Sequence, residues 1–228
     1  MRKTIGTAEI AIAAILVAGC ATSNSPTQSE YSGFLGDYSN LQQTQDVNGQ
    51  TILRYLNPKL TPANYTAVMV DPVAMYPKAE PTEQLSMATI DQVRGYLGTC
   101  LKQAIASRVR VVETPGPGVA KLQVAITGVA STAEGLKPYQ VVPMAFVATM
   151  AVNTVAGAPQ QAKLLVEALG TDSVSGEVLV KVVRTHTGER LQRVTSNMPV
   201  ITFDSIKPVI DEWCDATAKS VAQYVKPR

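Results

Sequence analysis

The side chains that could carry out acid–base or metal chemistry are few in this chain. His186 is the one histidine among 228 residues, and a catalytic base needs a nucleophile and an orienting partner within reach. No Gly-x-Ser-x-Gly segment offers such a nucleophile. Asp211, Glu212 and Asp215 lie close together near the C-terminus, and we interpret them as a solvated helix face rather than a cation site. Zinc sites usually draw on several His and Cys ligands, so we expect no enzyme activity, no metal and no cofactor.

Cys20 is the residue with the clearest chemical role. A positive start at Arg2 and Lys3 precedes a short apolar run over residues 10–17, which is the layout of a secretory signal. The run holds about 8 residues, whereas a membrane-spanning helix needs roughly 20. Residues 17–20, Val-Ala-Gly-Cys, resemble a bacterial lipobox. This resemblance implies that the Cys20 thiol receives a diacylglycerol and that Cys20 becomes the acylated N-terminus, the alternative being a plain signal peptide with a chance cysteine.

The other two cysteines, Cys100 and Cys214, have two possible fates. Export places the chain in an oxidising compartment, where two spare cysteines can pair. Each lies on the apolar stripe of a predicted helix, so the sulfurs meet if both helices pack on the same face of a sheet. The alternative is two separate buried thiols.

Composition restricts the kind of protein. Without residues 1–19 the chain keeps 209 residues and a net charge of about +1, and no basic run is longer than two residues. Proteins that bind nucleic acid usually cluster Lys and Arg, so we expect no nucleic-acid partner. Residues 20–30 lack large apolar side chains and predict a flexible tether. Residues 31–228 then form a single α+β periplasmic domain.

The hydrophobic pattern predicts the elements that position these residues. Apolar residues at three- and four-residue steps predict long helices over 82–105 and 205–225, with Thr82 and Asp204 as N-caps. Alternating or continuous apolar runs predict strands over 51–57, 65–70, 109–112, 122–127, 162–169, 178–183 and 191–195. Turns over 172–176 and 185–188 place His186 at a hairpin tip. We therefore expect an α+β two-layer sandwich, with a mostly antiparallel sheet of about five or six strands and two long helices on one face.

Residues 141–157 are unusual, because no charged residue occurs between Lys137 and Lys163. The segment is either an internal element packed on the domain or a surface that faces lipid or a partner. Pro143 and Asn153 interrupt it, so a spanning helix is not expected. The candidate partner or membrane surface within this segment consists of Met144, Phe146, Val147 and Met150.

Residues 31–41 follow shortly after the lipobox and form an irregular segment that we expect to pack onto the domain. Within it, residues 32–41 have the pattern Ser-Gly-Phe-Leu-x-Asp-Tyr-Ser-x-Leu. This run resembles the bacterial lipoprotein family catalogued as domain of unknown function 3313. A strand ending in Asp-Pro, a long helix, a Val-Pro step and a Ser-Gly-Glu hairpin agree with the resemblance over most of the mature chain. The resemblance implies an anchored envelope protein, and the family supplies no established activity or catalytic residues.

These observations favour a non-enzymatic binding or accessory lipoprotein on the periplasmic side of the outer membrane. Ala21, rather than Asp, follows Cys20, which favours the outer membrane in enterobacteria-like sorting. The expected partners are the bilayer, through acylated Cys20, and an envelope protein or a second copy of the chain. The alternative is a membrane-inserting oligomer that uses residues 141–157, although these residues lack the alternation of a barrel hairpin.

Overall fold

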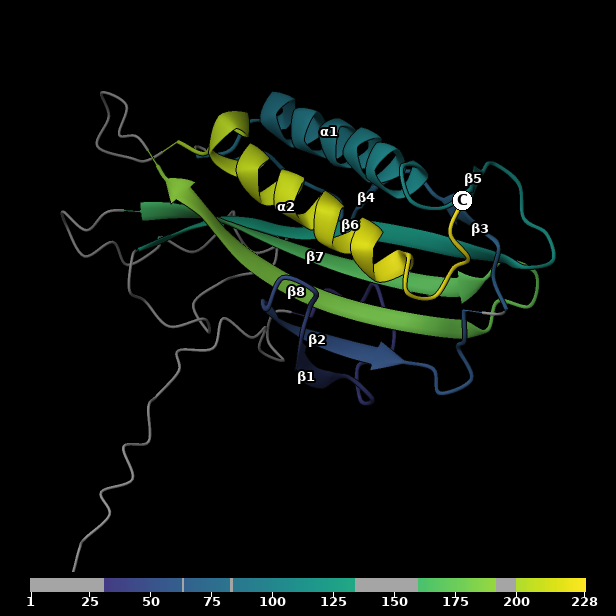
Figure 1. Cartoon of the computed structure of the whole chain (residues 1–228). Coiled ribbons are helices and arrows are strands. Elements are labelled where there is room, and N and C mark those ends of the chain that lie inside the picture. Colours follow the sequence, from purple (N-terminus) through teal and green to yellow (C-terminus); the bar gives the residue numbers. More distant parts are fainter. Residues whose placement is uncertain (1–30, 63, 83, 134–159, 192–199) are drawn as a thin grey trace, which may run out of the picture.

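The computed structural model describes residues 31–62, 64–82, 84–133, 160–191 and 200–228. It contains one mixed sheet with two helices on one face, so the predicted α+β class is confirmed (Figure 1). The elements in chain order are β1 (Gln42–Gln45), β2 (Thr51–Leu56), β3 (Ala67–Val70), β4 (Ala74–Met75), α1 (Met87–Ala106), β5 (Val111–Val112), β6 (Val119–Ala133), β7 (Gln160–Asp172), β8 (Val178–Arg190) and α2 (Phe203–Val221).

The sheet has eight strands, more than the five or six expected. Its order is β1-β2-β8-β7-β6-β3-β5, with β4 paired to β6. The pairs from β1 through β6 in this order are antiparallel, whereas β3, β4 and β5 join in parallel. These parallel strands have only two to four residues each, which is too short for a pattern that shows strand direction.

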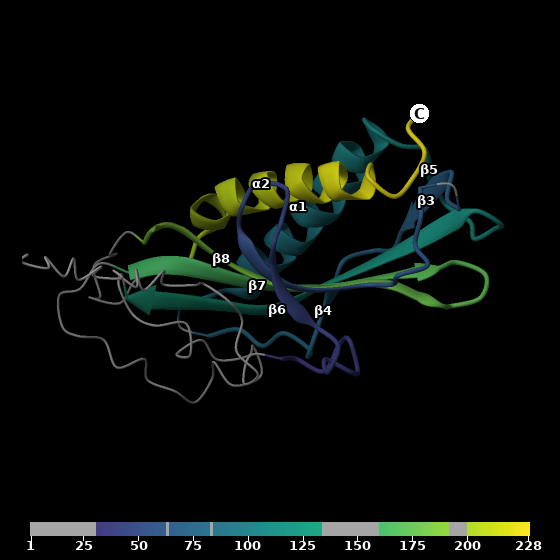
Figure 2. The same cartoon turned by 60° about the horizontal axis from the view of Figure 1, so that its bottom comes forward.

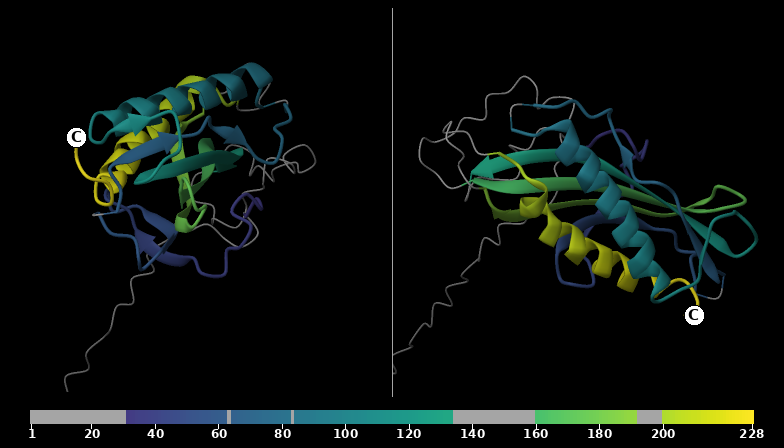
Figure 3. Two further views of the ribbon diagram at one scale, coloured as in Figure 1. Left: turned by 90° about the vertical axis from the view of Figure 1, so that its right-hand side faces the viewer. Right: turned by 90° about the horizontal axis from the view of Figure 1, so that it is seen from above.

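Both helices pack against the sheet through one apolar stripe each. In α1 the buried residues Ile90, Val93, Leu97, Leu101 and Ile105 recur at steps of three and four. The two helices run over the same face of the sheet when the molecule is seen from above (Figure 3, right). The main hydrophobic core lies between this helix layer and the sheet.

The predicted helix starts are wrong by a few residues. Ser86 caps α1 by accepting a hydrogen bond from the Thr89 amide, whereas the Thr82 side chain accepts from the Leu85 amide in a turn just before the helix. Thr202 caps α2 in a reciprocal pair of bonds with Ser205, and Asp204 lies inside the first turn. Both errors arise because several Ser, Thr and Asp side chains near each start can accept such a bond.

Strand β8 runs through the turn predicted over 185–188. The strand ends at Arg190, and His186 pairs with Leu164 of β7. Gly188 does not make a turn here. A Cβ atom at Gly188 would lie 2.6 Å from the carbonyl oxygen of Ser205, so this glycine permits the start of α2 to approach the sheet. The predicted turn over 172–176 is present, with the Asp172 carboxylate accepting bonds from two backbone amides.

The face of the sheet opposite the helices carries the irregular segment that follows the tether, as expected. Leu35 is buried with Leu53 and Val183 in a small second cluster, and the Tyr31 and Tyr38 rings stack with centroids 4.3 Å apart. Figure 2 shows this early part of the chain on the side of the sheet away from α1 and α2.

Several predicted features lie outside the described residues. These are the signal peptide, Cys20, the tether over 20–30, and the candidate surface of Met144, Phe146, Val147 and Met150. The described ends that flank residues 134–159 are paired, since Ala133 of β6 lies opposite Gln160 of β7. Within the described ranges, neither helix has the length and apolar character needed to cross a membrane.

Candidate functional site

An apolar cavity of about 150 Å³ lies between the sheet and the helix layer. Its walls come from both helices and from strands β2, β3, β6, β7 and β8. Most lining side chains are aliphatic, but Asp46, Arg54, Arg184 and Trp213 also line it. A concave apolar site with a few convergent polar groups is the usual form of a small-molecule site, so this cavity is the candidate functional site.

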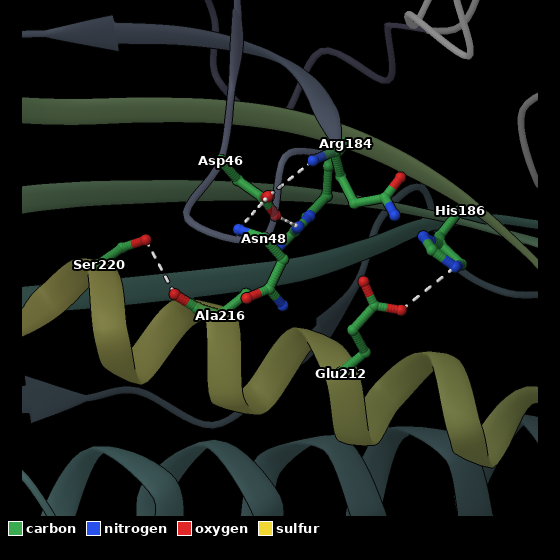
Figure 4. A network of polar contacts seen from close by, with 8 residues as sticks. Asp46, Asn48, Arg184, His186, Glu212, Ala216 and Ser220 are labelled. Atoms are coloured by element: carbon green, nitrogen blue, oxygen red, sulfur yellow. Dashed lines mark hydrogen bonds and ion pairs between the residues drawn. The ribbon is translucent and has the colours of Figure 1, made fainter.

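Arg184 and Asp46 form the central polar contact of this site (Figure 4). Arg184 lies on β8, and Asp46 begins the turn between β1 and β2. The side chains are only 10% and 3% exposed, respectively. The carbon at the centre of the Arg184 guanidinium also lies 5.2 Å from the centroid of the Trp213 ring. The cation is therefore held between a carboxylate and an aromatic face.

The Asp46 carboxylate also shapes the turn that brings it to Arg184. Its Oδ1 atom accepts hydrogen bonds of 2.9 Å from the amides of Asn48 and Gln50. The turn passes between β8 and α2 in Figure 4. Burial lowers the pKa of Arg184, and the Asp46 charge opposes that shift. A short local motif thus supplies a buried counter-charge to a strand far away in the sequence.

Two nitrogen donors at this site have no hydrogen-bond partner among the described residues. These are Nε of Arg184 and Nε1 of Trp213, and both are buried. Unpaired buried donors are uncommon, because each loses its bond to water without replacement. The cavity wall therefore offers two N–H groups that an acceptor could satisfy.

His186 lies beside this network rather than at an exposed hairpin tip. Its Nε2 atom is 3.5 Å from Oε2 of Glu212, and its side chain is 19% exposed. Burial lowers the pKa of His186, with the Arg184 charge acting in the same direction, while the Glu212 and Asp46 carboxylates oppose it. The ion pair alone would raise this pKa. Burial is the larger effect, so His186 is mostly neutral at neutral pH.

The lowered pKa of His186 predicts a pH-dependent stability. The unfolded chain binds a proton at this residue more readily than the folded chain, so the free energy of unfolding falls as the pH drops below about 6.5. His186→Gln should remove this part of the pH dependence. Urea titrations of both proteins between about pH 5 and 8 would show it, and parallel pH profiles would contradict the prediction.

The acidic cluster on α2 is engaged in surface ion pairs. Asp211 contacts Lys207 at 2.6 Å and accepts a bond of 2.5 Å from the Tyr96 hydroxyl of α1. Asp215 pairs with Lys219 at 2.6 Å and with Arg108 at 3.3 Å. Within the described residues, no group of three or more His, Cys, Asp or Glu side chains is arranged to hold a metal ion.

Cys100 of α1 and Cys214 of α2 form a disulfide in the structure. The Cα atoms are 5.9 Å apart, within the ordinary range for such bridges. Cys214 immediately follows Trp213, so the bridge holds the cavity-lining turn of α2 against α1. Of the two alternatives for these cysteines, the structure has the disulfide.

A second buried polar cluster lies on the other face of the sheet. Glu167 of β7 is fully buried. Its carboxylate accepts bonds from the Ser32 amide at 2.9 Å and from the Tyr38 hydroxyl at 2.7 Å. Burial, together with the bond to Glu167, raises the pKa of Tyr38 to about 12. Lys181 donates to the Asp37 carbonyl at 2.6 Å. Residues of the motif over 32–41 therefore attach the start of the domain to the sheet.

We expect Tyr38→Phe to lower the free energy of unfolding by about 1 to 3 kcal/mol, because a buried carboxylate loses a donor. Chemical denaturation would measure the change. Tyr55→Phe is a matched control, since among the described residues no hydrogen bond is recorded for the half-buried Tyr55 side chain. Its effect should stay within about 0.5 kcal/mol. Equal effects of the two substitutions would contradict the assigned bond.

The sequence did not single out Asp46, Arg54, Arg184 or Glu167. Arg54 and Glu167 are charged side chains with apolar neighbours in their strands, and that was the signal available. Arg184 lies in a strand that also holds Lys181, Thr185 and His186. Which face each charge takes, and which partner it meets, depends on the strand register. Lys121 of β6 also lines the cavity, and it pairs with Asp71 at 3.0 Å.

Comparisons with known proteins agree on one family. A family model described as protein of unknown function (DUF3313) matches residues 30–217. The chain is 33% identical over 219 residues to uncharacterized lipoprotein YdcL of Escherichia coli (strain K12), an alignment that covers 95% of this chain and 97% of that protein.

Solved structures show weaker likenesses. Hypothetical protein CT253 from Chlamydia trachomatis matches with a TM-score of 0.42 and 10% identity, over 71% of this chain and 98% of that one. The PelC dodecamer from Paraburkholderia phytofirmans matches with a TM-score of 0.36 and 14% identity, over 73% of this chain and 97% of that one. These likenesses bear on neither activity nor assembly.

Proposed function

This chain belongs to the DUF3313 family, and from that premise we propose that it is a lipoprotein anchored in the outer membrane by acylated Cys20. Its folded domain faces the periplasm and acts as a non-enzymatic binding or accessory module. The observation that carries this proposal is Cys20 at the end of the lipobox-like residues 17–20. The relative described as a lipoprotein, at 33% identity over most of both chains, supports it.

The anchor explains why a domain without a spanning helix among its described residues could stay in the envelope. Each CH₂ of an acyl chain contributes about 0.8 kcal/mol when buried in the bilayer, so two or three chains hold the protein permanently. The residue after Cys20 is Ala21. An Asp at that position would favour retention at the inner membrane under enterobacteria-like sorting.

The binding role is supported by the way in which the polar side chains at and near the cavity pair with one another. Arg184 pairs with Asp46 at the cavity wall, and His186 lies beside Glu212 outside the lining, so these groups act as parts of a scaffold. The proposed protein-partner surface is Met144, Phe146, Val147 and Met150. These residues lie in the connection between β6 and β7, and the described residues at its two ends, Ala133 and Gln160, are paired. The membrane-inserting alternative depends on the same connection.

Fractionation of cells fed with labelled palmitate tests the anchor. We expect the wild-type chain to carry the label and to separate with outer membranes. Cys20→Ser should lose the label and leave that fraction, because the acylated sulfur is absent. Ala21→Asp is a matched control in an enterobacterial host. It should keep the label but move to the inner membrane. A wild-type chain without label would overturn the proposal.

A further inference from the structure

We propose that the cavity between α2 and the sheet binds a small amphipathic monocarboxylate, with its apolar body among the aliphatic side chains and its carboxylate near Arg54, Arg184 and Trp213. This inference deepens the proposed binding role. It does not depend on the anchor at Cys20, because the cavity lies wholly within the folded domain.

The size and lining of the cavity set the apolar part of the ligand. A volume of about 150 Å³ equals that of an engineered protein cavity, lined by Leu, Ile and Phe side chains, that takes up benzene. Leu97, Leu101, Val166 and Leu179 are among the lining residues. Such walls favour an aromatic ring or a short alkyl chain and offer nothing to a sugar or a nucleotide, which carry many polar groups that would be left unpaired.

The unpaired hydrogen-bond donors indicate the polar group of the ligand. Nε of Arg184 and Nε1 of Trp213 have no partner in the described part of the chain. Trp213 is 2% exposed and the Arg184 side chain 10%, and the central carbon of the guanidinium lies 5.2 Å from the ring centroid. Two neighbouring N–H groups, one of them on a cation, match a carboxylate oxygen better than a neutral acceptor.

Arg54 adds positive charge at the same place. Arg54 lies opposite Val182 in the β2–β8 register, so Arg54 and Arg184 occupy diagonal positions on the same face of the sheet. The Cα atoms of such positions are roughly 7–8 Å apart. Asp46 provides one negative charge for the two guanidinium groups. The Glu212 carboxylate, which lies 3.5 Å from the mostly neutral His186, also acts on Arg184 and opposes the lowering of its pKa by burial. No ion pair or hydrogen bond of the Arg54 side chain is recorded within the described ranges. Arg54 therefore offers an anion a guanidinium group that is not held by another side chain in the described part of the chain.

The partly exposed lining residues locate the entrance. Arg54 on β2 and Thr217, Ser220 and Tyr224 at the end of α2 are half-buried, whereas Leu97 and Val166 on the inner wall are buried. A ligand entering between β2 and the end of α2 would place its apolar body inward and its charge beside Arg54. This direction agrees with the amphipathic character inferred from the walls.

Trp213, the one tryptophan of the chain, provides a direct test, because bromine quenches indole fluorescence on contact. The test uses the processed chain, residues 20–228 with Cys20→Ser, exported so that the disulfide forms. We expect bromobenzoate to quench the emission saturably and unlabelled octanoate to reverse the quenching. The methyl ester of bromobenzoate should bind at least about 10-fold more weakly, since it loses the charge-assisted bonds.

Two variants and one control variant separate the effect of the charge from that of the cavity. Arg54→Gln should weaken bromobenzoate about 10-fold, whereas Arg110→Gln, an exposed arginine outside the cavity, should leave the affinity unchanged. Ala168→Leu fills the cavity and should abolish saturable quenching while circular dichroism and the melting temperature show a folded domain. Quenching that rises linearly without saturation, or equal affinities for the acid and its ester, would overturn the proposal. A wild-type chain that carries no palmitate label in the fractionation experiment would overturn the anchor alone.

Discussion

Asp46→Ala is expected to lower the free energy of unfolding by about 3 to 5 kcal/mol, because it leaves the buried Arg184 cation without its counter-charge. The Asp46 side chain is 3% exposed and that of Arg184 10%, so water cannot replace the carboxylate without opening the site. The substitution also removes the acceptor for the amides of Asn48 and Gln50. Urea denaturation of the oxidised protein would measure the loss.

Two further variants identify the cause of this loss. Glu113→Ala breaks the exposed pair of Glu113 with Lys102, in which the carboxylate side chain is 77% exposed, and should cost at most about 1 kcal/mol. Arg184→Met introduced together with Asp46→Ala should recover part of the stability, because an apolar side chain of similar length needs no counter-charge. If Asp46→Ala alone costs no more than Glu113→Ala, the pair is not buried as the structure shows.

Replacing both Cys100 and Cys214 by alanine is expected to lower the free energy of unfolding by about 2 to 5 kcal/mol. The bridge joins residues 114 positions apart, so it removes many conformations from the unfolded chain. Alanine keeps the small apolar volume at Cys214, which is 2% exposed, and adds no buried hydroxyl. The loss should appear in urea denaturation without a reductant.

Reduction provides the control for the disulfide. With a strong reductant present, the wild-type protein and the double alanine variant should unfold at similar urea concentrations, because both then lack the cross-link. A difference that persists under reducing conditions would come from packing at the two sites. Mass analysis that finds two free thiols in the exported protein would contradict the bridge itself.

The helices could be predicted because their signal is local. A stripe at steps of three and four residues over about twenty residues of α1 leaves little choice of secondary structure. The first residues of the helices were harder to predict. Thr82 and Ser86 both accept a hydrogen bond from a backbone amide, but only Ser86 is followed by the helix. In strand β8, by contrast, a local signal predicted the wrong structure. Gly188 looked like a turn residue, but its role is to let the Ser205 carbonyl come close.

The candidate site was less predictable than the elements that build it. Arg54 and Glu167 were visible as charges among apolar strand residues, and Arg184 as one of several polar residues of β8. Nothing local shows which side of the sheet each one takes. Arg184 meets Asp46 from 138 positions away, and Glu167 meets Ser32 from 135 positions away. A shift of one residue in the pairing of β2 with β8 would send Arg54 to the other face.

The sequence by itself determined the family, the α+β class, and the two amphipathic helices that place Cys100 and Cys214 on apolar faces. These features depend on composition, on a contiguous motif, or on a periodicity that repeats within a few turns. Only the tertiary structure decided that the two sulfurs meet, that β3, β4 and β5 are parallel, and that Asp46, Arg184 and Trp213 surround one cavity. The reason is physical: such contacts join distant residues, and strand register and helix packing select them only when the whole chain is folded.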